Sequence, residues 1–398
     1  MNENMPALVG EPVSIFVLLL LLTCGAICLG AVARFQPVTK VLPAPIWIYF
    51  LAVTLASVGV LPAESVTYEA MAFLLVPLSL FLLTASSDFR SVKQVGPTAL
   101  TMLLAGSLGV VLGGLVAFVS VAPYLAEGVW KGFAVLAGAW IGGSANGIAV
   151  QQGLDAAPEI IGPLIIVDSL MGYFWIVFLL FLGTRQAWLS RLFRYEPAVG
   201  RASRTVTSQA VERKALTLPG LAAVVGLGVL ATALTGGVGG SLPELGEPTV
   251  VSGKTWTILL VVALGVACSF TRARAIEAHG ASDIGYFCML LLLATLGARG
   301  NFSAFLQAPL FLVSGALWLS IHLLVLVGVA RFFRISPALV AIGSAANIGG
   351  FVTAPLVALA FDRKLVPTAL LMAAVAQVLG IYLPFLLASV LADLSGPY

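Results

Sequence analysis

Charged side chains are scarce in this sequence. Asp, Glu, Lys and Arg make up 9% of its 398 residues, whereas hydrophobic residues make up 60%. A soluble domain carries about 25% charged residues, so this composition excludes an ordinary soluble fold. The mean hydropathy of +1.08 points the same way. The sequence therefore predicts an all-α polytopic membrane protein that resides in a lipid bilayer.

Histidine and cysteine are also rare, which limits the available chemistry. The chain has two histidines, His279 and His322, and four cysteines without the spacing of metal ligands. It contains no nucleophile elbow, zinc-protease or phosphate-binding motif. We therefore expect no enzyme activity, no cofactor and no structural metal. The net charge of +3 comes from dispersed basic residues, so nucleic acid is not an expected partner.

Apolar stretches long enough to cross a bilayer recur about twelve times. The first, 13–35, is too long for the apolar core of a signal peptide and is interpreted as a membrane helix. We interpret 13–184 and 217–392 as two transmembrane repeats. The polar stretch 185–216 carries seven Arg and Lys residues, which predicts a cytoplasmic linker. The expected location is the bacterial cytoplasmic (inner) membrane, with many crossings.

The loop charges conflict with six simple crossings in each half. Arg90 and Lys93 place one loop of the first half on the cytoplasmic side. Arg272 and Arg274 place a loop of the second half on the same side, which indicates that the second half is inverted relative to the first. Six crossings per half would instead make the halves parallel. Either one segment fails to span or a crossing lies in an apparent loop, so 11, 12 or 13 crossings fit.

Two similar glycine-rich stretches interrupt apolar runs, at 139–147 in the first half and 341–350 in the second. Unpaired backbone groups are costly in hydrocarbon, so a broken helix is tolerated there only in protein or beside a wet cavity. A helix that begins at such a break directs its free N–H groups toward the cavity, and a helix that ends there exposes its carbonyl groups. Paired breaks of this kind indicate a transport site. The alternative is a packing surface of small residues.

Asp168 is the one acidic residue placed well inside an apolar run. A charge there must be paired, hydrated or neutralised, which makes Asp168 the first candidate for a Na⁺ or H⁺ site. A purely structural carboxylate is the alternative. The candidate ion ligands are Asp168, Asn146, Asn347 and Gln377. The candidate solute-binding residues are Gly143, Ser144, Ala145, Asn146, Ser344, Ala345, Ala346, Asn347, Ser169 and Thr353. His322 is a candidate proton relay, or a packed core histidine.

At 139–146, around Asp168 and at 344–350, the chain resembles a family of bacterial membrane proteins known as domain of unknown function 819. The resemblance extends from about Val13 to Val390. It implies membership of the cation:proton antiporter and anion-transporter superfamily, with inverted repeats, two broken helices crossing at mid-membrane, and a core that moves against a scaffold. The antiporters of that superfamily keep acidic residues beside the crossing, where this chain has Ala145-Asn146 and Ala346-Asn347.

These features together predict a secondary transporter. It would move a small anionic or zwitterionic solute, such as an amino acid, peptide or organic acid, coupled to Na⁺ or H⁺ by alternating access. A sodium/proton antiporter without an organic substrate is the alternative, and a channel is less favoured because no ring of like charges is present. A homodimer is expected, and Na⁺ is the one metal ion anticipated.

Overall fold

The computed structural model describes residues 7–32, 44–125, 127–196, 213–215, 217–247, 249–299 and 308–395. Within these ranges the chain is almost entirely α-helical, and eight helices are long and apolar enough to cross a membrane. The predicted all-α polytopic class is therefore confirmed. The α-helices are α1 (Pro12–Ala31), α3 (Ala44–Ser57), α4 (Val66–Ser86), α5 (Pro97–Val121), α6 (Val129–Ala139), α7 (Ser144–Leu154), α8 (Pro158–Gly183), α9 (Gln186–Leu192), α10 (Leu218–Gly239), α11 (Gly253–Ser269), α12 (Ala281–Arg299), α13 (Ala308–Phe333), α14 (Pro337–Asn347), α15 (Gly350–Phe361) and α16 (Val366–Ser395).

Helix starts follow local sequence signals. Proline occupies the first turn of α1, α5, α8 and α14, where its missing N–H costs no hydrogen bond. The hydroxyls of Ser65, Thr217, Ser252 and Ser336 accept backbone N–H groups at the starts of α4, α10, α11 and α14. The starts of these helices are therefore set by proline and capping residues, and their lengths match the apolar stretches that follow.

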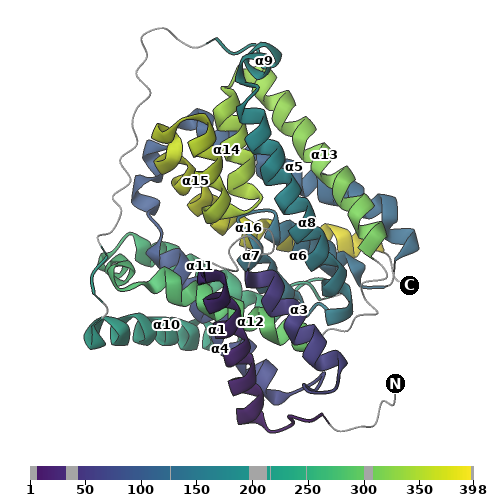
Figure 1. Ribbon diagram of the computed structural model, residues 1–398, viewed down its shortest axis with the longest axis vertical. Coiled ribbons are helices and arrows are strands. Elements are labelled where there is room, and N and C mark those ends of the chain that lie inside the picture. The colour runs from purple at the N-terminus through teal and green to yellow at the C-terminus, as the bar shows by residue number, and fades with distance from the viewer. Residues whose placement is uncertain are drawn as a thin grey trace.

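The helices form two bundles, and each draws on both halves of the sequence (Figure 1). The scaffold bundle packs α1, α3 and α4 against α10, α11 and α12. The core bundle packs α5, α6, α7 and α8 against α13, α14, α15 and α16. A 3-10 turn, Arg272–His279, follows α11 at an angle of 96°. The halves predicted from the sequence are therefore interleaved in space and form no separate bodies.

The first glycine-rich stretch is broken as predicted, but its two arms lie side by side. The chain leaves the helix after α6 and re-enters it at α7, eleven residues each. Lys131 at the start of α6 donates to the carbonyl of Asp155 just past the end of α7, at 3.5 Å. A Cβ on Gly147 of α7 would contact Ala139 of α6. We call α6, the turn 140–143 and α7 hairpin 1.

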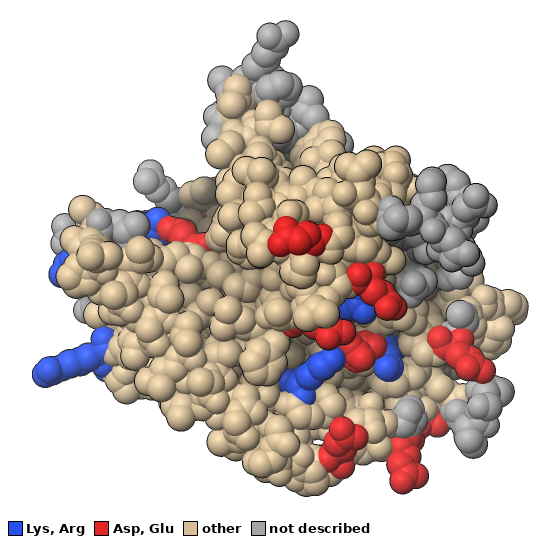
Figure 2. All heavy atoms as spheres, turned by 90° about the horizontal axis from the view of Figure 1, so that it is seen from below, with Lys and Arg blue, Asp and Glu red and all other residues tan. Residues whose placement is uncertain are grey.

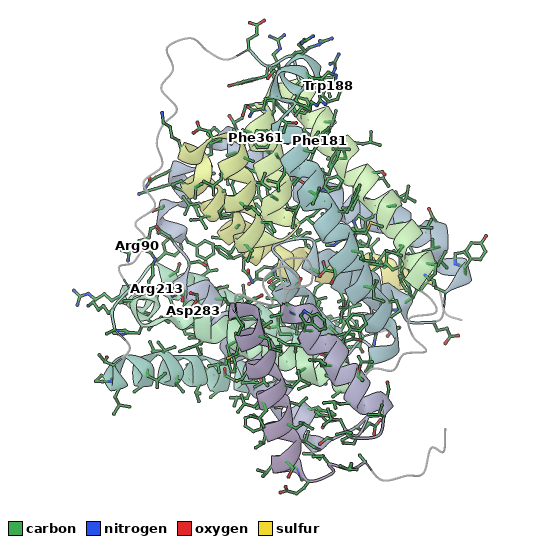
Figure 3. The ribbon with its side chains drawn as sticks, viewed as in Figure 1. Arg90, Phe181, Trp188, Arg213, Asp283 and Phe361 are labelled. Carbon is green, nitrogen blue, oxygen red and sulfur yellow. The ribbon has the colours of Figure 1, made fainter. Side chains whose placement is uncertain are left out.

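The second glycine-rich stretch folds in the same way. Thr353 of α15 donates to the carbonyl of Ala345 on α14 at 2.9 Å, so these arms also lie alongside each other. The far end of α15 reaches Gly183 at the end of α8, and Phe181 and Phe361 lie together there (Figure 3). The start of α14 lines a cavity with the same end of α8. We call α14, the turn 348–349 and α15 hairpin 2.

The sequence predicts two broken helices that cross at mid-membrane, whereas in the structure the two arms of each break lie side by side. An eleven-residue arm is about 16 Å long, roughly half of a 30 Å hydrocarbon core. An arm of this length can reach about the middle of a bilayer, and the second arm runs back alongside the first. The two hairpins meet at their tips instead of crossing as through-going helices.

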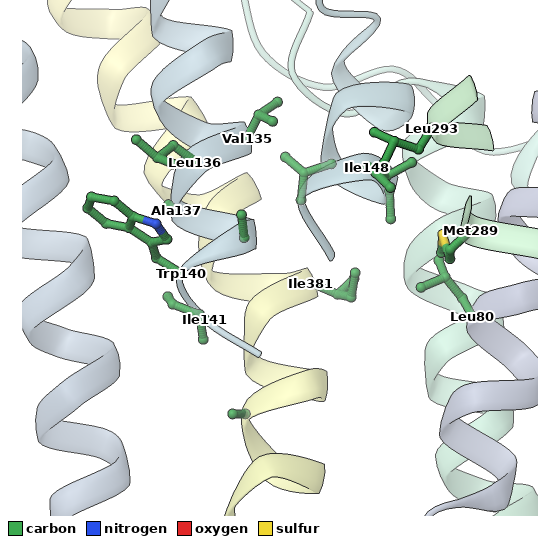
Figure 4. Close-up of a cluster of buried hydrophobic side chains, with 14 of the residues drawn as sticks. Leu80, Val135, Leu136, Ala137, Trp140, Ile141, Ile148, Met289, Leu293 and Ile381 are labelled. Atoms are coloured by element: carbon green, nitrogen blue, oxygen red, sulfur yellow. The ribbon is translucent and has the colours of Figure 1, made fainter. Parts of the chain in front are cut away.

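The outer surface agrees with a membrane environment. Large apolar side chains are exposed on helices of both bundles, including Phe73, Val177 and Leu324. On the face drawn in Figure 2, the charged side chains gather mainly in the middle and right of the view, and large parts of the rest are uncharged. The apolar interior also surrounds hairpin 1, where Trp140 and Ile141 at its turn lie near Ile381 (Figure 4).

Candidate functional site

The tips of the two hairpins contact each other through backbone atoms. The N–H of Gly142 donates to the carbonyl of Asn347 at 2.8 Å. Gly142, Gly143, Gly349 and Gly350 all have positive φ angles, between 61° and 112°, which only glycine adopts readily. A Cβ on Gly350 would overlap the Gly142 carbonyl. The glycines therefore permit both the sharp turns and the close approach of the tips.

Asn146 fastens the tip of hairpin 1 to α16. Its amide nitrogen donates to the carbonyls of Ile141 and Gln377, both at 2.9 Å. Its amide oxygen accepts from the Gln377 side chain at 2.7 Å. The Asn146 side chain is fully buried. Both of its donors are thus used within the protein.

Asn347 plays the matching part in hairpin 2, where it is held by α5. Its amide nitrogen donates to the carbonyls of Leu103 at 3.0 Å and Gly343 at 2.9 Å. Its amide oxygen accepts from the Ser107 hydroxyl at 2.7 Å. Asn347 is fully buried as well. The two asparagines therefore hold the tips in place, and a direct ion-ligand role for either stays a prediction.

A cavity of about 1040 Å³ lies between the hairpin tips and the scaffold bundle. The helix starts of α7 and α15 face it through their caps, Gly143 and Gly349, which supply no side chain to accept the first N–H groups. Two partial positive charges therefore converge on one space. The predicted residues that line this cavity are Gly143, Ser144, Ala145, Asp168, Ser169, Thr353 and Gln377.

Several of the predicted residues are either buried away from the cavity or line it with their polar groups already engaged. Ala345 and Ala346 are buried within α14, between the tip and the neighbouring helices. The hydroxyl of Thr353 is engaged with the carbonyls of Ala345 and Ile348. Gln377 is nearly buried and is held by Asn146. Of the polar side chains predicted to bind a ligand, Asp168, Ser144 and Ser169 are the ones best placed to reach a molecule in the cavity.

Asp168 is joined to hairpin 1 by two neutral donors. One carboxylate oxygen accepts from the Trp140 indole at 3.1 Å, and the other accepts from the Ser144 hydroxyl at 2.8 Å. Within the described ranges, no Lys or Arg forms an ion pair with Asp168. A carboxylate at this depth needs a proton or a cation to offset the cost of its charge. The role of Trp140 was missed because an indole in an apolar run resembles a packing residue.

The rim of the cavity carries charges that the sequence did not single out as a group. Asp88 pairs with Arg274 at 3.3 Å, with both side chains largely buried. Asp283 pairs with Arg213 at 2.7 Å (Figure 3). Asp88, Arg274 and Asp283 line the cavity. These residues come from turns of both halves, so their proximity becomes visible only in the fold.

His322 lies in the core bundle and is fully buried. Its Nδ1 donates to the Gly106 carbonyl at 3.0 Å, which leaves Nε2 to accept from the Ser344 hydroxyl at 2.9 Å. Ser344 also accepts from the Trp175 indole at 2.8 Å. This arrangement satisfies a buried histidine, and its use as a proton relay stays a prediction.

These features define a polytopic α-helical membrane protein with two re-entrant hairpins around an internal cavity. Comparison with known sequences places the chain in the family described as "Protein of unknown function (DUF819)", whose profile matches residues 19–394. The resemblance inferred from the sequence is thereby confirmed at the level of the family. The chain is also 25% identical over 370 residues to the "Uncharacterized membrane protein YjcL" of Bacillus subtilis (strain 168), covering 90% of this chain and 92% of that protein.

Proposed function

We propose that this protein is a secondary transporter for a small anionic or zwitterionic solute, coupled to Na⁺ or H⁺. The observation that carries the proposal is the meeting of two uncapped helix starts beside Asp168 in one cavity of about 1040 Å³. Re-entrant or broken helices that end at mid-membrane are the usual way in which transporters expose backbone groups to a solute. The cavity volume is near the upper end of the range for small-molecule sites, about 300–1,000 Å³.

The two kinds of ligand would use different parts of the site. The N–H groups at the starts of α7 and α15 favour an anionic group such as a carboxylate. Asp168 favours the coupling ion, because its charge is otherwise offset only by two neutral hydrogen bonds. Binding of the ion would neutralise Asp168 and lower the cost of moving the loaded core bundle past the apolar scaffold. In this mechanism the solute and the ion reinforce each other's binding.

We further propose ten membrane crossings. Eight helices are long enough by themselves. The seventeen-residue α11, which passes the same test together with the bent segment after it, can supply a ninth, and the shorter apolar α3 a tenth. Neither hairpin is counted as a crossing. The loops after the first, third, fifth, seventh and ninth crossings then lie on the same side of the membrane. Those loops carry Arg34, Arg90, the linker 185–216, Arg272 and Arg334. All basic loops are then cytoplasmic, the halves are inverted, and the conflict in the loop charges disappears.

Cysteine labelling tests this topology. In a variant without native cysteines, single cysteines at Glu64 and Glu244 are expected to react with a membrane-impermeant maleimide in intact cells. A cysteine at Arg194 is expected to react only after the membrane is permeabilised. Twelve crossings would reverse the results for Glu244 and Arg194 but not for Glu64, so the Glu64 variant fixes the orientation of the first half.

A solute screen tests the transport function. We expect one class of small carboxylates to raise the melting temperature of the purified protein, and Na⁺ or acidic pH to strengthen that effect. A ligand at 100 times its Kd adds about 2.7 kcal/mol to the free energy of unfolding. Uptake of the same solute into proteoliposomes should require the matching ion gradient. Proton movement on addition of Na⁺ alone, with no solute effect, would support the sodium/proton antiporter instead.

A further inference from the structure

A second cavity, of about 580 Å³, lies in the core bundle away from the site of Asp168. Its walls come from the end of α8, from α9, from the second half of α13 and from the start of α14. We call it the α9 cavity. The proposed topology places this end of the bundle at the cytoplasmic face. The short helix α9 covers it, with Leu189 buried and Trp188 exposed.

The walls of the α9 cavity are almost wholly apolar. They include Trp175, Leu326 and Val340, and within the described residues Arg185 is the one charged side chain that lines it. The guanidinium of Arg185 lies 5.4 Å from the centre of the Phe181 ring. Arg185 is exposed while it lines the cavity, so its charge lies at the mouth, where the cavity opens to the surface. This pattern fits a ligand with a long apolar part and a negatively charged end. It does not fit the small polar solute of the first cavity.

The surroundings of the mouth are rich in arginine. Arg191 and Arg194 lie on or next to α9, and Arg331 and Arg334 lie at the end of α13, where Arg331 donates to the Leu192 carbonyl at 2.5 Å. All four are exposed, and Glu196 is the acidic residue that lies close to them in the chain. Basic clusters at the cytoplasmic membrane surface attract anionic phospholipids. The charge at the mouth therefore complements a lipid headgroup.

The floor of the α9 cavity is connected to hairpin 2. Ser344 lines the cavity and belongs to α14. Its hydroxyl holds the Trp175 indole of α8 and the His322 ring of α13. Three helices thus meet at one hydroxyl group. A chain that filled the cavity would press on this junction and support the arm of hairpin 2 that ends at Asn347.

We propose that the α9 cavity binds one acyl chain of an anionic phospholipid from the cytoplasmic leaflet, with the phosphate on Arg185, and that this lipid stabilises hairpin 2. The occupant is a lipid because the cavity joins apolar walls to a basic mouth at the membrane surface. This inference does not depend on the transported solute. It would hold for a transporter, an antiporter or a channel built on the same fold.

Native mass spectrometry of the purified full chain tests the proposal. We expect phosphatidylglycerol to bind more tightly than phosphatidylcholine with the same acyl chains. In Arg185→Gln its apparent affinity should fall by more than about fivefold, the value of one basic residue at an anionic surface, because the direct contact with the phosphate is lost as well. Arg191→Gln is the matched control, because Arg191 is exposed on α9, which begins just after Arg185, and does not line the cavity. Its loss should not exceed about fivefold. Equal losses in the two variants would show attraction to the surface charge alone and overturn the proposal.

A filled cavity provides the second arm of the test. Val327 on α13 lines the cavity, so the larger ring in Val327→Phe would fill part of it. Leu324→Phe places the same ring at an exposed position of that helix. Only Val327→Phe should lose the rise in melting temperature caused by phosphatidylglycerol. If lipid-free Val327→Phe fails to fold, Arg185→Gln still decides the question. Equal binding of the two lipids, or preference for a free fatty acid over phosphatidylglycerol, contradicts the assignment.

Discussion

Asp168→Asn is expected to reduce ion-driven solute uptake to background while the protein stays folded. The amide has nearly the same shape: its oxygen can still accept from the Trp140 indole, and its NH2 group can donate to the Ser144 hydroxyl, which can act as acceptor. It cannot take up a proton at physiological pH or offer a negative charge to Na⁺. Coupling requires that the ion binds differently to the two states of the carrier. The measurement is uptake into proteoliposomes with and without an imposed Na⁺ or H⁺ gradient.

A second carboxylate provides the control for Asp168. Asp155 follows α7 and pairs with Lys254 at 3.4 Å, with both side chains well exposed. An exposed pair of this kind contributes at most about 1 kcal/mol, so Asp155→Asn should retain uptake. Both variants should elute as the wild type does on size exclusion. Gradient-driven uptake that survives in Asp168→Asn would remove this residue from the coupling mechanism.

The sequence was sufficient to locate the breaks in the helices. Gly143 and Gly349 interrupt apolar runs next to the carboxamides of Asn146 and Asn347, and such positions are poor places for a continuous membrane helix. The class of fold followed from composition alone. Both are local properties, because the cost of an unpaired backbone group or a charge in hydrocarbon depends on the immediate neighbours along the chain.

The sequence does not show whether the chain continues across the membrane after each break or turns back. An eleven-residue apolar arm has the same composition whether it continues across the bilayer or turns back. The contact of Lys131 with the Asp155 carbonyl distinguishes the two, and it depends on the fold. The conflict in the loop charges was the available signal. It indicated that one segment fails to span or that a crossing lies in an apparent loop, and the two hairpins are the basis for the proposed ten crossings.

The partners of the buried polar groups were also beyond the sequence. Asn146 is bound to Gln377, and Asn347 is bound to Ser107, each more than 200 positions away in the chain. A buried carboxamide must find partners, but nothing in its own segment says which. For this reason both asparagines were predicted as ligands of an ion or solute, whereas in the structure their donors hold the hairpin tips.

Gly380→Ala is expected to disrupt the junction between α16 and hairpin 1. Gly380 faces the turn of the hairpin, and a Cβ there would overlap the carbonyl oxygen of Ile141 and approach the amide of Asn146. Both groups belong to the hydrogen bond that shapes the tip. Overpacking typically costs about 1–3 kcal/mol, and this clash involves backbone that cannot rotate away. We therefore expect a loss of at least about 3 kcal/mol in the free energy of unfolding.

Gly328→Ala on α13 is the matched control, because a Cβ at Gly328 meets no other atom within 4 Å. Alanine is a better helix former than glycine by about 1 kcal/mol, so this variant should be as stable as the wild type or slightly more so. The melting temperatures of both variants in detergent give the comparison. Similar values for Gly380→Ala and Gly328→Ala would mean that α16 does not press on the tip of hairpin 1. In that case the hydrogen bonds of Asn146 to Ile141 and Gln377 could not be what fixes the tip beside Asp168.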